Sequence, residues 1–203
     1  MNDPLQEKKP LVLIGGGGHC KACIDVVEAT GQWEILGILD MEERVGEKVL
    51  DYPIIGTDDL VVQLARDGVS FLVSIGQIKT AVPRRRAYER VKAASGKLAT
   101  IISPLAYVAR SASLGEGSIV MHHALLNADA TIGCNVIINS KALVEHDAMV
   151  GDHTHISTAA IVNGGATIGS GSFVGSNAAI MQGVSVSSDT FIPAGTLYKR
   201  QKA

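Results

Sequence analysis

Residues 108–192 read VARSASLGEGSIVMHHALLNADATIGCNVIINSKALVEHDAMVGDHTHISTAAIVNGGATIGSGSFVGSNAAIMQGVSVSSDTFI. Every sixth position of this stretch is aliphatic, without a miss: Val108, Leu114, Val120, Leu126, Ile132, Ile138, Val144, Val150, Ile156, Val162, Ile168, Val174, Ile180, Val186 and Ile192. A period of six fits neither an α-helix nor an ordinary strand. It is typical of a hexapeptide β-helix, in which each repeat forms one short strand and one turn.

The position two residues before each aliphatic residue is small in nearly every repeat, as at Ala124, Ala142 and Ala160. Side chains alternate along a strand, so both residues point into the same narrow prism, and the one near the corner must be small. Three repeats close one coil, so the fifteen repeats predict about five coils, with residues eighteen apart stacked above one another. The repeat does not by itself define the handedness of the coil.

The composition of the 203-residue chain excludes several classes of protein. Hydrophobic residues make up 46% of it and aromatic residues 4%, which is enough for a core and suits a prism too thin for rings. The net charge of −2 gives no reason to expect binding to nucleic acid or to a membrane surface. No signal peptide or long apolar run is present, and three cysteines do not form a secreted disulfide framework. We therefore expect a cytoplasmic protein.

An α/β domain is expected over residues 11–103, between a flexible N-terminus (1–10) and a β-helix over 104–197, with a basic tail at 198–203. Its strands are expected at 11–14, 34–39, 54–55, 69–75 and 98–102, and its helices at about 21–30, 58–66 and 81–94, the second capped by Thr57. Strands that alternate with helices are typical of a small open parallel sheet of Rossmann-like outline.

A run of glycines, Gly15 to Gly18, followed by His19 joins the first strand to the first helix. Backbone N–H groups at such a turn, together with the helix N-terminus, bind anions, so a diphosphate or a sugar is expected at Gly17, Gly18 and His19. The dinucleotide fingerprint lacks its third glycine, where Cys20 stands, so NAD is not expected. A tight turn without a ligand remains the alternative.

Two further strand ends are expected at the same edge of the sheet. Asp40 follows the second strand, and Gly76-Gln77 follows the strand at 69–75. Open α/β sheets bind ligands at the carboxyl ends of their strands, so these residues favour a binding site there. An ordinary strand-end Asp is the alternative reading of Asp40.

Five of the six histidines lie between His122 and His155, inside the β-helix. The core has no use for imidazole, so these side chains are expected outside it or at its corners. His146-Asp147 falls in the turn of its repeat, and eighteen residues later the same corner holds Gly164-Gly165, which leaves space above the ring. A histidine oriented by a carboxylate that stabilises its cationic form is a good general base. A solvated polar turn is the alternative.

The cysteines point to no chemistry of their own. Cys20-Lys-Ala-Cys23 matches the CxxC pattern at the start of a helix, but neither a second pair of zinc ligands nor a flanking Trp or Pro accompanies it. Redox and metal functions are therefore not expected. Cys134 is expected to fill space within the β-helix.

The whole chain resembles the hexapeptide-repeat acetyltransferases that modify nucleotide-linked amino sugars, among them the bacillosamine and perosamine N-acetyltransferases and the sialic acid O-acetyltransferase-like group. The motifs that carry the resemblance are Ile14-Gly-Gly-Gly-Gly-His19 with Lys21 and Asp25, Ile38-Leu-Asp40, Ser74-Ile-Gly76, and above all Val144-Glu-His-Asp147 followed by His155-Ile-Ser157. The resemblance implies a left-handed β-helix and a homotrimer with active sites between subunits. It also implies direct acetyl transfer from acetyl-CoA to a nucleotide-linked 4-amino sugar, with UDP as the preferred nucleotide, and no metal.

The resemblance also implies roles for single residues. His146 corresponds to the catalytic base and Asp147 to the carboxylate that raises its basicity. Positions that line acetyl-CoA correspond to His155, Ser176 and Ala194. Positions that hold the nucleotide sugar correspond to Gly17, Gly18, His19, Asp40 and Gly76, and Asn139 corresponds to a polar neighbour of the sugar. Two departures from the family pattern are Gln77, where Asn is frequent, and the absence of a Gly-x-Pro-Ala-Lys segment after Thr196.

Three other functions remain open. O-acetylation of sialic acid or of another sugar hydroxyl would use the same base. A zinc hydratase of the γ-carbonic anhydrase kind would need three converging histidines, and His122, His123, His146, His153 and His155 do not show the expected spacing. A non-catalytic solenoid would serve only as a binding surface.

Overall fold

In the computed structural model, which describes residues 7–199, the chain forms two compact units. Within the described range, the first unit contains residues 7–76 together with Pro83–Ala99. The second unit contains Gln77–Val82 and residues 100–199. The short segment Gln77–Val82 therefore belongs with the β-helix, although the sequence on both sides of it belongs to the α/β unit.

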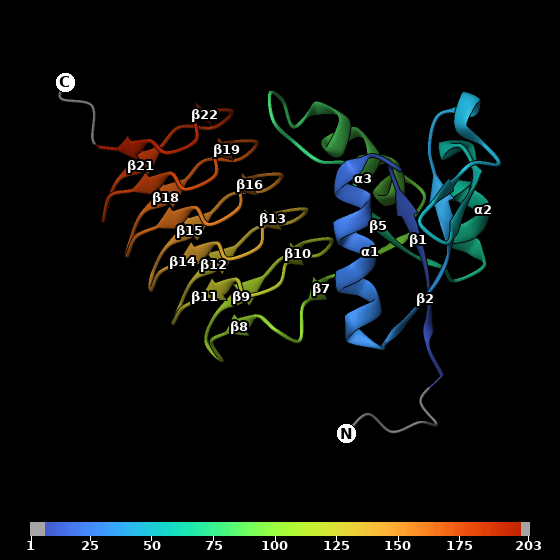
Figure 1. Ribbon diagram of the computed structural model, residues 1–203, viewed down its shortest axis with the longest axis horizontal. Helices are drawn as coiled ribbons and strands as arrows, with labels where there is room; N and C mark the ends of the chain where they lie inside the picture. The colour runs from blue at the N-terminus through green and yellow to red at the C-terminus, as the bar shows by residue number, and fades with distance from the viewer. Residues whose placement is uncertain (1–6, 200–203) are drawn as a thin grey trace. The chain divides into compact units, whose positions relative to one another are not determined.

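The first unit is an α/β fold around one six-stranded sheet, with strand order β3-β4-β2-β1-β5-β6 (Figure 1). All neighbouring strands are parallel except β3 and β4. The elements are β1 Lys9–Ile14, α1 Gly18–Thr30, β2 Trp33–Leu39, the 3₁₀ turn η1 Glu42–Arg44, β3 Lys48–Val49, β4 Tyr52–Gly56, the 3₁₀ turn η2 Asp58–Leu60, α2 Val61–Arg66, β5 Ser70–Val73, α3 Val82–Ala93 and β6 Lys97–Leu98.

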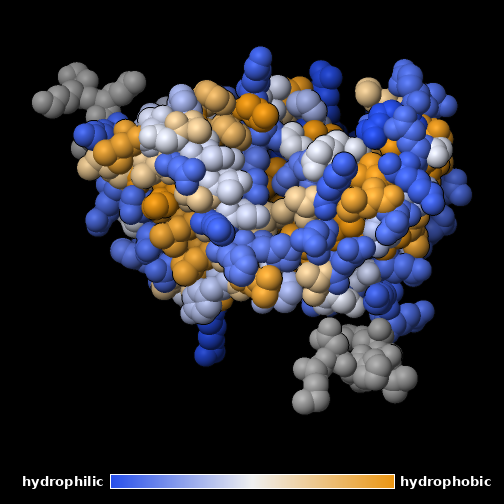
Figure 2. All heavy atoms as spheres, viewed as in Figure 1, coloured by the Kyte–Doolittle hydropathy of each residue, from blue (hydrophilic) through white to orange (hydrophobic). Residues whose placement is uncertain are grey.

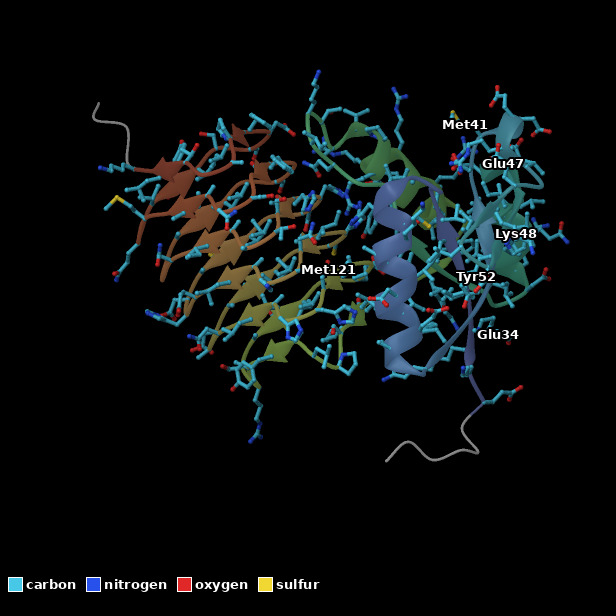
Figure 3. All side chains as sticks on the ribbon, viewed as in Figure 1. Glu34, Met41, Glu47, Lys48, Tyr52 and Met121 are labelled. Carbon is cyan, nitrogen blue, oxygen red and sulfur yellow. The ribbon has the colours of Figure 1, made fainter. Side chains whose placement is uncertain are left out.

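Burial explains why the central strands lack polar alternation. The last four residues of β1, from Leu11 to Ile14, are buried on both faces, as expected of a central strand in a parallel sheet. At the β3–β4 edge the side chains are more polar, and Glu47, Lys48 and Tyr52 are labelled there in Figure 3. The Tyr52 hydroxyl donates to Glu28 Oε1 at 2.8 Å, and this bond, together with partial burial and the charges of Glu28 and Asp51, raises the pKa of Tyr52 to about 12.

Several expected boundaries of the α/β unit were wrong. Helix α1 begins at Gly18 rather than at residue 21, because the extended Gly17 already ends the glycine turn. The helix expected at 58–66 is a 3₁₀ turn followed by α2, although Thr57 does cap its start by accepting from the Asp59 N–H at 3.4 Å. Lys9 and Pro10 belong to β1 rather than to a flexible end, and residues 1–6 lie outside the described range.

The strand expected at 98–102 was also wrong, because it is two strands in different sheets. Residues Lys97–Leu98 form β6, which pairs with β5 in the α/β sheet. Residues Ile101–Ile102 form β7, which pairs with β10 in the β-helix. Both halves are apolar, so the local pattern did not reveal the change of sheet.

The second unit is a parallel β-helix of two-residue strands arranged in three sheets (Figure 1). The sheets contain six, six and five strands, in the orders β22-β19-β16-β13-β10-β7, β23-β20-β17-β14-β11-β8 and β21-β18-β15-β12-β9. The strands are β7 Ile101–Ile102, β8 Tyr107–Val108, β9 Ser113–Leu114, β10 Ile119–Val120, β11 Leu125–Leu126, β12 Thr131–Ile132, β13 Ile137–Ile138, β14 Leu143–Val144, β15 Met149–Val150, β16 His155–Ile156, β17 Ile161–Val162, β18 Thr167–Ile168, β19 Phe173–Val174, β20 Ala179–Ile180, β21 Ser185–Val186, β22 Phe191–Ile192 and β23 Leu197–Tyr198.

The expected packing of the repeat is confirmed. Val144 pairs with Leu126 below and Val162 above, eighteen residues away in each direction. The aliphatic residues from Val120 to Ile192 and the small residues two positions before them form one buried cluster. Strands β7 and β23 extend the series by one repeat at each end, so Tyr198 belongs to a strand rather than to the expected tail, of which residues 200–203 lie outside the described range.

The turns of the β-helix use left-handed backbone three residues after the inward aliphatic residue. Non-glycine residues hold this conformation at many corners, including Asp129, Asp147 and Asn177. The residue directly after the aliphatic one is often glycine for a different reason. A Cβ on Gly115 would lie 2.5 Å from the Gly133 carbonyl carbon of the next coil, so the stacking of coils requires glycine there.

The outer faces of the β-helix differ in polarity, and Figure 2 shows apolar side chains among polar ones on its surface. The face formed by β8, β11, β14, β17, β20 and β23 presents an apolar column, in which Tyr107 is 60% and Leu197 is 53% exposed. The other members of this column are partly exposed: Leu125, Leu143, Ile161 and Ala179. The face formed by β9, β12, β15, β18 and β21 presents instead Ser113, Thr131, Met149, Thr167 and Ser185.

Candidate active site

His146 and Asp147 form an exposed pair in the turn that follows β14. His146 Nδ1 lies 2.8 Å from Asp147 Oδ2, and the two side chains are 55% and 65% exposed. A carboxylate only accepts, so Nδ1 carries a proton and Nε2 is left as the basic atom of the neutral ring. The hydrogen bond to Asp147 and the negative charges of Asp147 and Glu145 raise the pKa of His146. The expected pairing of these two residues is therefore present in the structure.

The backbone of this corner directs the pair. Asp147 has a φ of 60°, the left-handed conformation that short polar side chains tolerate. Glu145, the residue before His146, accepts from Asn127 Nδ2 at 2.7 Å, and Asn127 occupies the same position one coil below. A Cβ on Gly164 would lie 2.7 Å from His146 Nε2 and 2.8 Å from Cε1. The space above the ring that the sequence predicts therefore exists only because residue 164 is glycine.

A second polar cluster lies at the neighbouring corner, between β13 and β14, and on the adjoining strand β16. His155 Nδ1 lies 2.9 Å from the Gln77 carbonyl oxygen, and His155 Nε2 lies 3.1 Å from Asn139 Nδ2. The ring also packs edge-on against Phe173, with centroids 5.2 Å apart. His155 is 6% exposed, so it differs from His146 in both burial and partners.

Ser176 and Ala194 belong to this second corner and not to the corner of His146. Ser176 Oγ lies 3.0 Å from Ser157 Oγ, and Ala194 stacks on Gly175 so closely that a Cβ on that glycine would overlap the Ala194 N atom. The expected residues thus form two groups at the two edges of the apolar face: His146 with Asp147, and Asn139 with His155, Ser157, Ser176 and Ala194.

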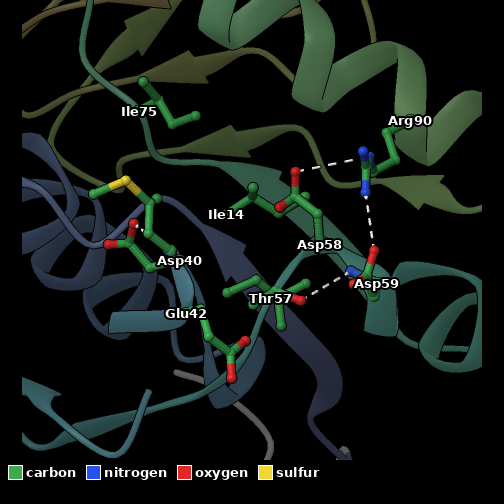
Figure 4. Close-up of a pocket in the computed structure, with 11 residues that line it drawn as sticks. Ile14, Asp40, Glu42, Thr57, Asp58, Asp59, Ile75 and Arg90 are labelled. Carbon is green, nitrogen blue, oxygen red and sulfur yellow. Dashed lines mark hydrogen bonds and ion pairs between the residues drawn. The ribbon is translucent and has the colours of Figure 1, made fainter. Parts of the chain in front are cut away.

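The α/β unit contains a cavity of about 470 Å³ at the carboxyl ends of its parallel strands. It is lined by Ile14, Gly15, Leu39, Asp40, Met41, Glu42, Thr57, Asp58, Asp59, Ile75 and Arg90. Figure 4 shows Arg90 facing Asp58 and Asp59, with N–O distances of 3.7 and 3.6 Å. A cavity at this edge is where open α/β sheets bind their ligands, as the sequence predicts.

Asp40 connects this cavity to the glycine turn. Its Oδ2 accepts from the Gly16 N–H at 2.8 Å and from Arg44, and its Oδ1 accepts from the Met41 N–H at 2.8 Å. Gly17 and Gly18 are exposed at the start of the thirteen-residue α1, which has no side-chain cap and no acidic residue in its first turn. Their N–H groups and the helix dipole therefore face solvent in the way that anion binding requires.

His19 and Gly76 pack against each other, since a Cβ on Gly76 would lie 3.1 Å from His19 Cβ. Burial, assisted by the charge of Arg84, lowers the pKa of His19 to about 4, so the ring is neutral at physiological pH. Arg84 is 1% exposed and donates to the Ile75 carbonyl at 2.8 Å, and burial lowers its pKa to about 10. None of these three residues lines the cavity.

The expectation that Gln77 ends a strand at the ligand-binding edge was wrong. Gln77 is 3% exposed, and its Nε2 donates to the Gly171 and Ser172 carbonyls at 3.0 and 3.1 Å. These bonds join it to the β-helix, 94 and 95 residues along the chain. It therefore belongs to the cluster of His155 and not to the cavity.

The remaining candidate groups are ordinary parts of the fold. Cys20 and Cys23 are free and buried, and burial raises the pKa of both thiols, which opposes the thiolate that redox chemistry needs. Over residues 7–199, no three His, Cys, Asp or Glu side chains converge as metal ligands, which leaves the zinc hydratase without a ligand set within one chain. None of the helices in the described part of the chain has the length and apolarity to cross a bilayer.

Comparison with known proteins places the chain among sugar acetyltransferases. Residues 10–91 match the PglD N-terminal domain. The acetyltransferase domain of PglB from Neisseria gonorrhoeae FA1090, solved in complex with acetyl coenzyme A, has 32% identity and a TM-score of 0.88, over 95% of this chain and 92% of that one. PerB from Caulobacter crescentus, solved with CoA and GDP-perosamine, has 34% identity and a TM-score of 0.85, over 92% of this chain and 86% of that one. The chain belongs to this family of sugar acetyltransferases.

A curated relative agrees with this assignment over part of its length. UDP-N-acetylbacillosamine N-acetyltransferase from Bacillus subtilis (strain 168) is 30% identical over 115 residues, which are 56% of this chain and 51% of the relative. The chain thus aligns with about half of that protein. The resemblance inferred from the motifs is confirmed, and so is the fold, an α/β unit with a left-handed β-helix.

Sequence reasoning missed several polar residues that lie beside the candidate site residues. Arg44 binds both Asp40 and the Gly16 carbonyl, and Arg90 faces Asp58 and Asp59 across the cavity. Both arginines lie in charged stretches that resemble any solvated surface, so no local signal distinguished them. The pairing of Asn127 with Glu145 could have been found, because the two residues are eighteen positions apart and the period was known.

Proposed function

We propose that this protein is an acetyl-CoA-dependent N-acetyltransferase that acts on a nucleotide-linked 4-amino sugar. The observation that carries the proposal is the His146–Asp147 pair, held at 2.8 Å at an exposed corner beside Gly164. The relatives support it, since PglB was solved with acetyl coenzyme A and PerB with CoA and GDP-perosamine. Acetyl-CoA is a co-substrate in this scheme.

His146 would act as the general base through Nε2. The sugar nitrogen arrives as an ammonium ion and gives a proton to Nε2, and the resulting amine attacks the thioester carbonyl carbon. As the C–N bond forms and the C–S bond breaks, the nitrogen loses a second proton to solvent, and the imidazolium returns its proton to the leaving thiolate. Asp147 stabilises the imidazolium throughout, which is the role that the raised pKa of His146 supports.

The developing oxyanion needs a donor, and we assign this role to the Gly164 N–H. At the same turn position in the coils below, the N–H groups of Ala128 and His146 donate to the side chains of Asn127 and Glu145. Asn163 instead turns its amide to the Ile180 carbonyl at 2.6 Å, and the Gly164 N–H has no acceptor among residues 7–199. An N–H group beside His146 Nε2 is suited to a tetrahedral intermediate formed there.

The cavity of the α/β unit is the proposed site of the nucleotide. Its position at the strand ends, with Asp40 at the second strand, suits a ribose hydroxyl, and Gly17, Gly18 and the N-terminus of α1 suit a phosphate. His19 and Gly76 would shape this region rather than contact the nucleobase, because they pack against each other outside the cavity.

The free cysteines, two of which are buried, support a reducing compartment such as the cytoplasm.

We further propose a homotrimer in which the apolar face of each β-helix is buried against the neighbouring subunits. This face is flanked by the Asn139 corner on one side and the His146 corner on the other. In a threefold arrangement the His146 corner of one subunit meets the Asn139 corner of the next. His155, Ser176 and Ala194 would then line acetyl-CoA bound beside the neighbour's base, and Asn139 would lie beside the sugar. The exposed apolar column from Tyr107 to Leu197 supports burial against another subunit.

The trimer is tested by sedimentation of Leu143→Glu, which places a charge in the apolar column. We expect dissociation to monomers, whereas Thr131→Glu, on the polar face, should leave the assembly intact. Mixing His146→Ala subunits with Asn139→Ala subunits should restore activity if each site uses both corners from different chains. A monomeric wild-type protein, or no restoration on mixing, would refute the shared site.

The reaction is tested by thiol release from acetyl-CoA with a panel of UDP-, GDP- and dTDP-linked 4-amino sugars, together with free and CMP-linked sialic acid. We expect release with one of the amino sugars and a loss of about 10²–10⁴-fold in His146→Ala. Thiol release only with a sialic acid would indicate that the acceptor group is a hydroxyl rather than an amine. Failure to bind any CoA ester would refute the transferase.

A further inference from the structure

Gln77 is a buried residue that joins a short connecting segment to the β-helix. Its side-chain Nε2 donates to two carbonyls, those of Gly171 and Ser172. Its Oε1 has no donor among residues 7–199. A buried acceptor without a donor costs free energy, which the two hydrogen bonds made by Nε2 offset.

The main-chain carbonyl of Gln77 determines which nitrogen of His155 carries the proton. A carbonyl oxygen can only accept, and it lies 2.9 Å from Nδ1, so Nδ1 is protonated. The neutral ring then has its lone pair on Nε2, which lies 3.1 Å from Asn139 Nδ2. Both ring nitrogens are engaged within the protein, and His155 is buried, so this ring is not placed to act as a base for a substrate.

The ring in turn orients the amide of Asn139. A lone pair on His155 Nε2 requires a donor, so the amide must present its NH₂ group to the ring. The Asn139 Oδ1 atom then accepts from the Ser140 N–H at 2.8 Å, which the reversed amide could not do. One hydrogen of the NH₂ group points to His155, and the second remains for a group outside this network.

We propose that Gln77 is a positioning residue of the acetyltransferase site. Its side chain anchors its own carbonyl, the carbonyl holds His155 as the Nδ1–H tautomer, and His155 holds Asn139 with an N–H donor toward the acceptor sugar. The ligand atom that this arrangement fits is an acceptor oxygen, such as a sugar hydroxyl or a phosphate oxygen. The inference rests on the proposed function, but the tautomer of His155 can be measured without any substrate.

The first test is ¹⁵N NMR of protein labelled at histidine, with His155→Gln used to assign the resonances. We expect the wild-type His155 to be neutral, protonated at Nδ1 and unprotonated at Nε2. In Gln77→Leu, which removes the amide and leaves an apolar side chain one bond shorter, the Nε2–H tautomer should appear. Lys79→Ala, an exposed residue of the same segment, should leave the signal unchanged. A wild-type ring protonated at Nε2 would overturn the proposal whatever the variants do.

The second test is kinetic. We expect Gln77→Leu to lower kcat/KM for the acceptor sugar about tenfold, the equivalent of one hydrogen bond, with KM for acetyl-CoA little changed. In an Asn139→Ala background the same substitution should have no further effect, because both act through one amide. Additive losses in kcat/KM, or a slower Gln77→Leu enzyme with an unchanged His155 tautomer, would refute the proposed series of contacts from Gln77 through His155 to Asn139. An absence of all acetyl transfer would instead refute the proposed function, and the NMR result would still report on these contacts.

Discussion

Replacement of Gly164 by alanine adds one methyl group directly above the proposed base. The new Cβ would lie 2.7 Å from His146 Nε2 and 2.8 Å from Cε1, whereas ordinary contacts begin at about 3.4 Å. The backbone at residue 164 is not left-handed, so alanine fits it without strain. The imidazole, which is 55% exposed, must therefore move while the β-helix remains as it is.

The magnitude follows from the displacement. The ring has to move by about 0.7 Å to relieve the contact, and a misplacement of about 1 Å in a reacting group costs about 10²-fold in rate. We therefore expect kcat to fall about 10²-fold in Gly164→Ala. Stability should stay equal or rise by about 0.4–1 kcal/mol, because alanine restricts the unfolded chain more than glycine does.

The assay combines thiol release from acetyl-CoA with thermal unfolding of four proteins: the wild type, Gly164→Ala, His146→Ala and the double variant. If the methyl group acts only on the ring, it should have little effect once the ring is gone, so the double variant should be as slow as His146→Ala alone. A Gly164→Ala enzyme of wild-type rate would refute the placement of His146 as base. A large loss of stability would refute the steric argument.

Four further predictions concern the charge, the core, the stacking and metal. Asp147→Asn removes the charge that keeps the His146 ring protonated to higher pH, so the rising limb of the kcat/KM profile against pH should shift to lower pH; an unmoved limb would contradict the assignment. Ile156→Ala should lower the free energy of unfolding by about 2–5 kcal/mol in urea, whereas Met149→Ala, on an exposed face, should change it by less than about 0.5 kcal/mol. Gly115→Ala places a Cβ against backbone atoms of the next coil and should cost about 1–3 kcal/mol of stability, with activity per folded molecule unchanged. Treatment with a chelator should leave acetyl transfer intact. Stoichiometric zinc by elemental analysis, together with a loss of acetyl transfer on chelation, would contradict this and favour the zinc hydratase.

Much of the fold and part of the site could be predicted from the sequence. The period of six predicted the β-helix, the residues that point into it and the stacking of residues eighteen apart, because each repeat makes the same local strand and turn. The same count placed Gly164 above His146, and adjacency placed Asp147 beside it. The glycine run and Asp40 marked the strand ends where the cavity lies, because the carboxyl ends of parallel strands meet at one edge.

Only the tertiary structure decided which side chains meet across long separations. Gln77 and Gly171 are 94 residues apart in the sequence. The hydrogen bond from the Gln77 side-chain amide to the Gly171 carbonyl places residue 77 with the β-helix rather than at the edge of the sheet. The same holds for Leu98 and Ile101, whose apolar pattern is continuous although they belong to different sheets. It also holds for the two histidines, which look alike in sequence. The His146 ring is exposed and has space because residue 164 is glycine. The His155 ring is buried, and a carbonyl and an amide contact its two nitrogens.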